Sequence, residues 1–497
     1  MGRGGAGDTA VGSSYGTFSA LIFIFNLVVG TGALTLPKAM ADAGWMLSIL
    51  FLAIVAVFAF ISATFVIEAQ AAANAALKSA QTDDGPRAGS LSLQKPLLAG
   101  PSSASLYQIT ERVEVTYMGE LLGSPRLRTF FSVMLMVYLY GDIAVYSVAI
   151  PTALSSVARL PWDRPAEVPD GGSDSGLIDD DDRLSYSLYL LGFALLTLPI
   201  AFLDFQKSAW LQYTTCAVRN SAFFIMIAVM AVHIRTDGAG IPPSAHLPRK
   251  PIKIADPAEF AELYGVCIYA FMCHHSLPSI ISPIRNKSLV TRIFLVDYVF
   301  ILLAYIGLGG VSLLAFDGLP DSPGSCPPTK ITVERTPCPV QHLITQNFES
   351  FSYQPLAYYL SLYPVFALTT NFPLICITLR NNLQTIVPGL LGIHLKRWQC
   401  TLLAALPPYI TAYLYRDVDS LAGITGGYAG VFIQLIIPAM LAILARRWEA
   451  EHPGAGVNVH RSWFASEWWP NVLLAWAALC LLLNTVFNIL KWTGVMS

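Results

Sequence analysis

Long apolar stretches alternate with short polar ones along the whole chain. Most of the apolar stretches are about 20 residues long, which is what an α-helix needs to cross the hydrocarbon core of a bilayer. We therefore expect a membrane protein with eleven spanning helices joined by polar loops. The approximate ranges of the predicted spans are 17–40, 46–74, 128–156, 185–203, 209–234, 261–281, 293–316, 355–379, 399–416, 421–445 and 468–491.

Two of these stretches are interrupted in their middles. The first is broken by the sequence Gly-Thr-Gly at residues 30–32, and the sixth by Cys-His-His-Ser at residues 273–276. Glycine costs roughly 1 kcal/mol in a helix interior, and unwound backbone at membrane depth is tolerated only where it is buried in protein or lines a cavity. A pair of broken spans in corresponding positions of the two halves points to the binding site of a transporter.

The spacing of the breaks predicts the fold class. The sixth span is the first plus five, so we expect an all-α integral membrane fold of about eleven helices, with two five-helix repeats of inverted topology of the leucine-transporter type. No plain sequence repeat relates the halves, so this prediction depends on the break positions. The repeats cover about 17–234 and 261–445, followed by an extra helix at about 468–491.

The remaining segments are polar. We expect a cytosolic N-terminal arm at 1–16, a partly disordered cytosolic loop at 78–124 and an extracytoplasmic loop at 317–354. Within the first loop, residues 106–122 are amphipathic, which is typical either of a helix on the membrane surface or of a linker that ends in a helix.

Composition and charge support this picture. The chain is 54% hydrophobic and 12% charged, whereas soluble domains carry about 25% charged residues. A net charge of −2 gives no basic footprint, so the expected partners are the lipid bilayer and a small molecule, with no nucleic acid. Basic residues gather in alternate loops, which by the positive-inside rule places the N-terminus in the cytosol. Both the plasma membrane and an endolysosomal membrane fit this pattern.

Two of the eight cysteines lie outside the apolar stretches. Cys326 and Cys338 share the polar loop sequence CPPTKITVERTPC. In an extracytoplasmic loop a disulfide is the natural state of such a pair, so we predict one here.

Two ionisable residues lie at membrane depth, where charge is costly and usually functional. Asp142 has Tyr138 and Tyr146 four residues away on either side, which places both phenols on its helix face. A carboxyl group in this setting either carries a coupling proton, contacts substrate or makes a structural polar contact. Arg219 needs an anion, a carbonyl cluster or water, and it could replace a bound sodium ion or extend toward the cytosolic surface.

Polar groups at two further places are candidates for substrate or ion binding. At the second break, one of His274 and His275 is expected to contact substrate while the other packs, with Ser276 beside them. In the eighth span, three oxygen-bearing side chains suit an alkali cation or a polar substrate, although threonine often bonds to the preceding helical turn instead. These are Thr369, Thr370 and Asn371.

The pattern N-x-x-x-G-T-G-x-L-x-x-P, running from Asn26 to Pro37, resembles the opening signature of the amino acid/auxin permease family. FMCHHSLPSIISPI, TTNFP and ITGGYAG resemble further helices of that family, and GTGALTLPKA with VYLYGDIAVYS resembles one of its orphan subgroups. The resemblance implies eleven helices, a cytosolic N-terminus and amino acid transport driven by protons or sodium.

The resemblance also implies roles for individual residues. Gly30, Thr31 and Gly32 would receive the substrate carboxylate, and a sodium-type site would draw on Asn26 with Thr369 or Thr370. Asp142 and Arg219 depart from the general family pattern, which disfavours sodium coupling and favours either a proton mechanism or loss of transport. Tyr138 completes the expected substrate-binding set with the residues of the two breaks.

The predicted function is therefore secondary active transport of amino acids or similar small solutes by alternating access, with symport of a proton. The alternative is a sensor of transporter fold that binds an amino acid without turnover and signals through the 78–124 loop. No catalytic motif, cofactor motif or metal-ligand spacing is recognisable, so we expect neither an enzyme nor a metal site.

Overall fold

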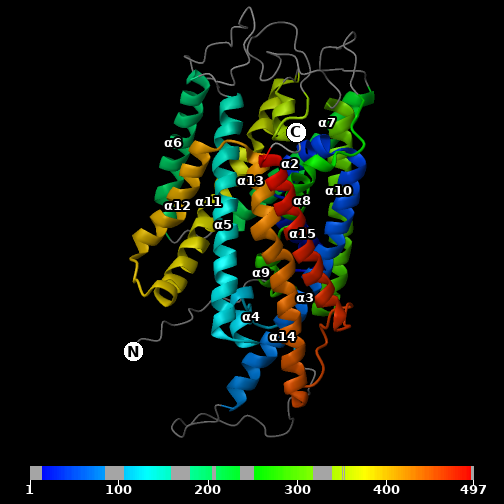
Figure 1. Ribbon diagram of the computed structural model, residues 1–497, viewed down its shortest axis with the longest axis vertical. Helices are drawn as coiled ribbons and strands as arrows, with labels where there is room; N and C mark the ends of the chain where they lie inside the picture. The colour runs from blue at the N-terminus through cyan, green and yellow to red at the C-terminus, as the bar shows by residue number, and fades with distance from the viewer. Residues whose placement is uncertain are drawn as a thin grey trace, which may run out of the picture.

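A computed structural model describes residues 14–83, 106–157, 180–203, 209–235, 251–316 and 339–493, except 350 and 352. These residues form a long bundle of helices (Figure 1) without a strand; their one β-type pairing is an isolated parallel bridge between Tyr15 and Ile284. The end of α15 lies at the upper end of the bundle in Figure 1, whereas α4 and the C-terminal ends of α3 and α14 lie at the lower end.

The helices follow the predicted apolar stretches closely. The α-helices are α1 (Thr17–Val28), α2 (Gly32–Ala43), α3 (Trp45–Asp83), α4 (Val115–Leu121), α5 (Pro125–Val157), α6 (Asp180–Phe202), α7 (Ala209–Arg235), α8 (Phe260–Ala270), α9 (Leu277–Ile281), α10 (Val290–Phe316), α11 (Gln354–Leu391), α12 (Arg397–Leu414), α13 (Val418–Ile424), α14 (Ile437–Glu451) and α15 (Trp468–Trp492). Short 3₁₀ turns are η2 (Pro257–Glu259), η3 (His274–Ser276), η4 (Lys287–Leu289), η5 (Ile344–Phe348) and η8 (Pro453–Ala455).

Nine candidate spans are present in the described part of the chain when α1 and α2 are counted as one bent span. Two of the eleven spans predicted from the sequence are not among these nine. One is α12, which is long enough at 18 residues but less apolar than the other spans, and the other is the pair α8 and α9, which has 11 and 5 residues around a break. The all-helical membrane architecture is thus confirmed, and the nine spans are those that are long and apolar in their own right.

The first predicted break is present. α1 and α2 bend by 56° at the residues between them. α1 ends because the backbone of Val29 leaves the helical region, at φ −76° and ψ 89°. Gly32 then begins α2 against α8, where a Cβ atom would lie 2.6 Å from the Cα atom of Ala270. A glycine is therefore needed for the two broken spans to touch.

The second break is also present. α8 ends at Ala270, residues 271–273 are not helical, and the chain continues through η3 into the short helix α9. The hydroxyl group of Tyr305 on α10 donates to Ala270 O at 2.8 Å and lies 3.3 Å from Val28 O. One side chain therefore bonds to the carbonyl ends of both α1 and α8.

Between α13 and α14 the helix widens into two π-helical segments, η6 (Thr425–Gly430) and η7 (Phe432–Ile436). Here glycines allow close packing, because a Cβ atom on Gly426 would lie 2.0 Å from Gly265 O of α8. α13 and η6 therefore pack against α8, the first part of the second broken span. Residues 421–445 do not form one regular α-helix.

The two predicted loops are partly described. α3 continues to Asp83, and α4 packs against α3 and α5 within the segment predicted to be partly disordered. The side chain of Asn74 accepts hydrogen bonds from the amide groups of Thr110 and Glu111 at 3.0 and 2.8 Å, so residues 106–124 pack onto the bundle. Residues 84–105 and 317–338 lie outside the described part, and so does the predicted disulfide between Cys326 and Cys338.

Candidate functional site

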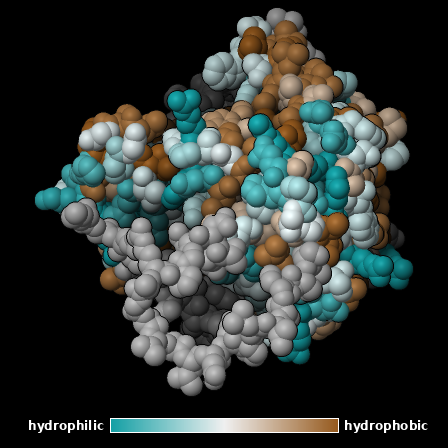
Figure 2. Space-filling view, turned by 90° about the horizontal axis from the view of Figure 1, so that it is seen from below, coloured by the Kyte–Doolittle hydropathy of each residue, from teal (hydrophilic) through white to brown (hydrophobic). Residues whose placement is uncertain are grey.

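A cavity of about 660 Å³ lies between the two broken spans, α5, α7 and α11. It reaches the lower end of the bundle, where the exposed residues Arg112 and Glu114 form part of its lining. Figure 2 looks onto this end and shows hydrophilic residues mixed with hydrophobic ones, as expected where a bundle meets water. Most residues singled out from the sequence line the cavity: Asn26, Gly30, Thr31, Gly32, Tyr138, Asp142, Arg219, His275, Ser276 and Asn371.

Arg219 on α7 lies at the carbonyl end of α1. Its Nη1 atom donates to Asn26 O at 2.6 Å and lies 3.4 Å from Val29 O. The side chain is only 5% exposed, and its Nε atom has no acceptor among the described residues. The C-terminal end of a helix carries partial negative charge, so the guanidinium group stabilises the end of α1 by both hydrogen bonds and charge.

The amino end of α2 faces the same break with the opposite polarity. Within the described residues, no acceptor takes the amide hydrogens of Thr31 and Gly32. Free amide groups at a helix N-terminus favour an anion. Gly30 leaves the cavity open at this point, because the nearest atom to a Cβ there would be Val28 O, 4.0 Å away.

Three side chains link the first break to α5. The hydroxyl group of Tyr269 on α8 donates to Asp142 Oδ1 at 2.5 Å, and it lies 3.3 Å from Thr31 Oγ1. Because the phenol hydrogen goes to Asp142, Thr31 donates to Tyr269. Asp142 is 8% exposed and has no ion-pair partner in the described part of the chain. A carboxyl group in this position can change its protonation state without breaking a salt bridge.

The two histidines of the second break differ in their surroundings. His275 lines the cavity and packs against Tyr138 with ring centroids 5.4 Å apart. His274 does not line it; its Nε2 atom lies 2.8 Å from Ser62 Oγ and 3.1 Å from Ala59 O, which ties η3 to α3. This is the division between a cavity-facing and a packed histidine that the sequence suggested.

The three polar residues of α11 singled out from the sequence also differ in whether they line the cavity. Asn371 lines the cavity, whereas Thr369 and Thr370 do not. Thr370 Oγ1 donates to Ala367 O at 3.0 Å, which is the intrahelical bond expected for a threonine without a ligand role. The predicted sodium-type set of Asn26 with these threonines is thus not brought together around the cavity.

Sequence analysis missed the residue that connects the site. Tyr269 lies in the apolar run GVCIYAF, where a tyrosine is ordinary, and its contact with Asp142 depends on the packing of α8 against α5. Tyr15 was also missed. It lines the mouth of the cavity, donates from its hydroxyl to Ile280 O at 2.5 Å, and pairs through its backbone with Pro283 and Arg285. We call this contact the N-terminal latch.

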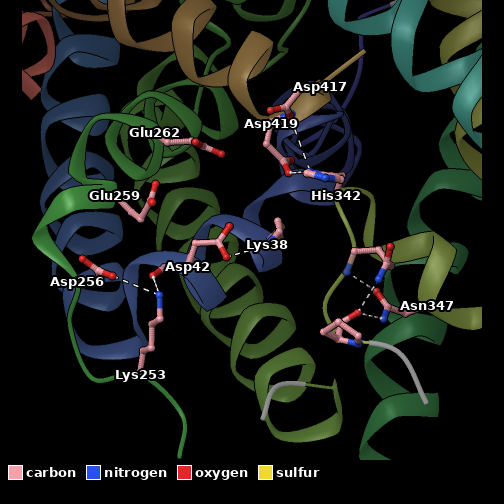
Figure 3. A network of polar contacts seen from close by, with 12 residues as sticks. Lys38, Asp42, Lys253, Asp256, Glu259, Glu262, His342, Asn347, Asp417 and Asp419 are labelled. Atoms are coloured by element: carbon pink, nitrogen blue, oxygen red, sulfur yellow. Dashed lines mark hydrogen bonds and ion pairs between the residues drawn. The ribbon is translucent and has the colours of Figure 1, made fainter. Parts of the chain in front are cut away.

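Ion pairs gather at the opposite, upper end of the bundle (Figure 3). Lys38 bonds to Asp42 at 2.7 Å on α2, and Lys253 bonds to Asp256 at 3.2 Å in the segment before α8. His342 Nδ1 lies 2.6 Å from Asp419 Oδ2 at the start of α13. This hydrogen bond raises the pKa of His342 above its usual value, because it favours the protonated ring. Two of the described polar contacts join separate elements: Lys253 Nζ donates to Asp42 O at 3.4 Å, which connects the segment before α8 to α2, and His342 to Asp419 connects the loop before α11 to α13.

Comparison with known proteins assigns the chain to a family. The model of the family described as transmembrane amino acid transporter protein matches residues 13–319. The chain belongs to this family. The matched residues include both broken spans. They also include Asp142, Arg219 and Tyr269, which line the cavity.

Similar proteins span nearly the full length of this member of the family. Transmembrane protein 104 of Mus musculus is 35% identical over 98% of this chain and 99% of its own length. The homologue from Drosophila melanogaster is 33% identical over 95% and 97%, and that from Caenorhabditis elegans is 28% identical over 96% and 98%. The resemblance to an orphan subgroup seen in the motifs is therefore confirmed.

Proposed function

We propose that this protein is a secondary active transporter that moves amino acids or similar small solutes across a membrane by alternating access, coupled to a proton. The supporting architecture is a leucine-transporter-type bundle of eleven helices in which the short segments α12 and α8–α9 also cross the membrane. The observation that carries the proposal is one cavity that meets both breaks, Asp142 and Arg219.

The cavity suits a zwitterion. In this proposal the substrate carboxylate binds the free amide groups at the start of α2, where the helix dipole favours an anion. Arg219, at the end of α1, adds positive charge nearby. The ammonium group lies toward Asp142, and Tyr138, His275 and Ser276 form the remaining walls.

Proton coupling follows from the chain of hydroxyl groups. When Asp142 is ionised, it accepts the hydrogen of Tyr269. When Asp142 takes up a proton, Tyr269 no longer has to donate to it, and its hydrogen is available to Thr31 or to substrate at the first break. The guanidinium group of Arg219 meanwhile fills the carbonyl sites that a sodium ion would use, which favours a proton as the coupling ion.

Alternating access requires that one end be open while the other is closed. The cavity reaches the lower end, and close glycine contacts with the ion pairs of Figure 3 close the upper end. With the N-terminus in the cytosol, this is an inward-facing state. Transport would then require the contacts that join elements at the upper end to open, which include Lys253 to Asp42 O and His342 to Asp419.

A sensor without turnover is the second candidate. The observation in its favour is that Arg112 and Glu114, from the segment between α3 and α4, line the mouth of the same cavity. A bound ligand would then contact the 78–124 segment directly and could change its position. This arrangement would serve signalling as well as it serves transport.

Flux separates the two candidates. Purified protein is screened for binding of amino acids by thermal shift at several pH values, and each ligand found is then tested for uptake into proteoliposomes with an inward proton gradient. We expect saturable uptake above the external concentration. Binding without flux supports the sensor, and sodium-driven uptake that is independent of pH refutes proton coupling.

A further inference from the structure

Three metal-ligating side chains meet at the upper end of the bundle, away from the cavity. One ligand atom from each of His342, Asp417 and Asp419 lies within 4.8 Å of the others. His342 comes from the loop before α11, and the two aspartates flank the start of α13, where Asp419 lies 77 residues after His342 in the chain. Figure 3 shows the three side chains turned toward one another.

Hydrogen bonds position Asp417 and the loop that carries His342. Asp417 accepts from the amide groups of Asp419 and Ser420 at 3.0 and 3.2 Å and from Ser420 Oγ at 2.7 Å. The loop that carries His342 is folded by Asn347, which bonds to both Gln341 and Pro339. Supporting hydrogen bonds of this kind orient ligands in metal sites.

An unsatisfied oxygen gives independent support for a ligand. Asp419 is 1% exposed, and its Oδ1 atom has no hydrogen-bond donor among the described residues. A buried carboxylate oxygen without a partner is costly, and a cation that Asp419 binds through Oδ1 as well as Oδ2 would satisfy it. His342 itself is half exposed, so the cluster is accessible from the upper end.

We propose that His342, Asp417 and Asp419 form a binding site for a divalent transition metal ion of the zinc class. Two carboxylates balance the charge of a divalent ion, and one imidazole with two carboxylates suits zinc with a water molecule as fourth ligand. Calcium needs six to eight oxygen ligands, which this cluster does not offer.

The geometry needs only a small adjustment. Metal–ligand distances of about 2.0–2.2 Å in a tetrahedron separate the ligand atoms by about 3.3 Å. His342 Nδ1 is now 2.6 Å from Asp419 Oδ2 and 3.8 Å from Asp417 Oδ1, and one ligand atom of each residue lies within 4.8 Å of the others. The two distances to His342 each have to change by less than about 1 Å. Lys38 on α2 and Glu262 on α8 are the other charged groups near the cluster. A bound ion would tie the loop before α11 to α13.

Cobalt titration tests the site, because Co²⁺ in a tetrahedral site absorbs visible light. Full-length protein in nanodiscs, carrying a tag without histidine, is titrated with Co²⁺, and Zn²⁺ is then added to displace it. We expect saturation at one ion per chain. His342→Gln and Asp419→Asn should each weaken binding by at least about tenfold, whereas Asp256→Asn, which removes a charge from the same end, should bind as the wild type does.

The outcome is decisive in both directions. Absence of saturable binding by the wild type, or equal affinity in the wild type and His342→Gln, overturns the proposal. Because His342 is half exposed, its variant should fold normally, and it decides the question even if Asp419→Asn unfolds. The unfolding temperature of each variant without metal serves as the folding control.

Discussion

The two breaks of this protein differ in charge. The first carries a fixed cation at the end of α1 and free amide groups at the start of α2. The second is neutral: the hydroxyl group of Tyr305 bonds to the end of α8, and His274 ties η3 to α3. A broken helix at membrane depth can therefore be stabilised either by a charged side chain or by neutral hydrogen bonds. Only the charged break is prepared for an ionic ligand.

The largest expected effect is that of removing the charge at the first break. Arg219→Gln should abolish substrate binding and uptake, because the end of α1 loses its cation. It should also lower stability by about 1.5–3 kcal/mol, the contribution of a hydrogen bond to a charged group. Uptake into proteoliposomes and the unfolding temperature are the measurements.

Arg380 is the matched control for this variant. It is 2% exposed and donates to Ala201 O at 3.1 Å at the end of α6, but it does not line the cavity. Arg380→Gln should lose similar stability and keep its uptake. Wild-type uptake by Arg219→Gln would show that the charge at the first break has no functional role.

The second effect concerns the link between the breaks. Asp142→Asn is fixed in a neutral state, so it should lose accumulation driven by a proton gradient while exchange of substrate persists, because exchange needs no net proton movement. Counterflow and gradient-driven uptake measure the two activities. Asp297→Asn, at another buried aspartate in α10 that does not line the cavity, is the control. Normal accumulation by Asp142→Asn would place the proton elsewhere, with His275 as the next candidate.

A smaller effect is expected where the two broken spans touch. Gly32→Ala places a methyl group 2.6 Å from the Cα atom of Ala270 and should destabilise the protein by about 1–3 kcal/mol through overpacking. Gly30→Ala meets only open space and should leave the unfolding temperature unchanged. Equal unfolding temperatures for the two variants would mean that α2 and α8 do not pack as described.

The smallest effects separate the histidines of the neutral break. His274→Leu should lower stability by about 0.5–1.5 kcal/mol, because it loses the hydrogen bond that ties η3 to α3. His275→Leu should instead raise the substrate concentration needed for half-maximal uptake, with little change in unfolding temperature. The reverse pattern, in which only the His274 variant changes substrate affinity, would exchange their roles.

Much of this arrangement was predictable from the sequence. Hydropathy located the spans, and the breaks followed from glycine and polar residues inside apolar runs. The end of the second span was not predicted, because AQAAANAALKSAQTD continues α3 to Asp83 through alanine-rich helix propensity rather than apolar character. Asp142 and Arg219 were recognisable since charge is rare at membrane depth.

Contacts between distant segments could not be predicted from the sequence. Tyr269 is an ordinary aromatic residue in an apolar run, and its contact with Asp142 on α5 joins positions 127 residues apart. His342 and Asp419 lie in different loops and share no motif with ligand spacing, so the sequence indicated no metal cluster. Both arrangements depend on packing across the bundle, which hydrophobic periodicity does not encode.

The N-terminal latch closes a very long loop of the chain. Tyr15 and Ile280 are 265 residues apart in sequence, and closing a loop of that length in a free chain costs roughly 5 kcal/mol. The few hydrogen bonds of the latch, at about 0.5–1.5 kcal/mol each, cannot meet that cost with any surplus. The contact therefore depends on the rest of the bundle to bring its two sides together.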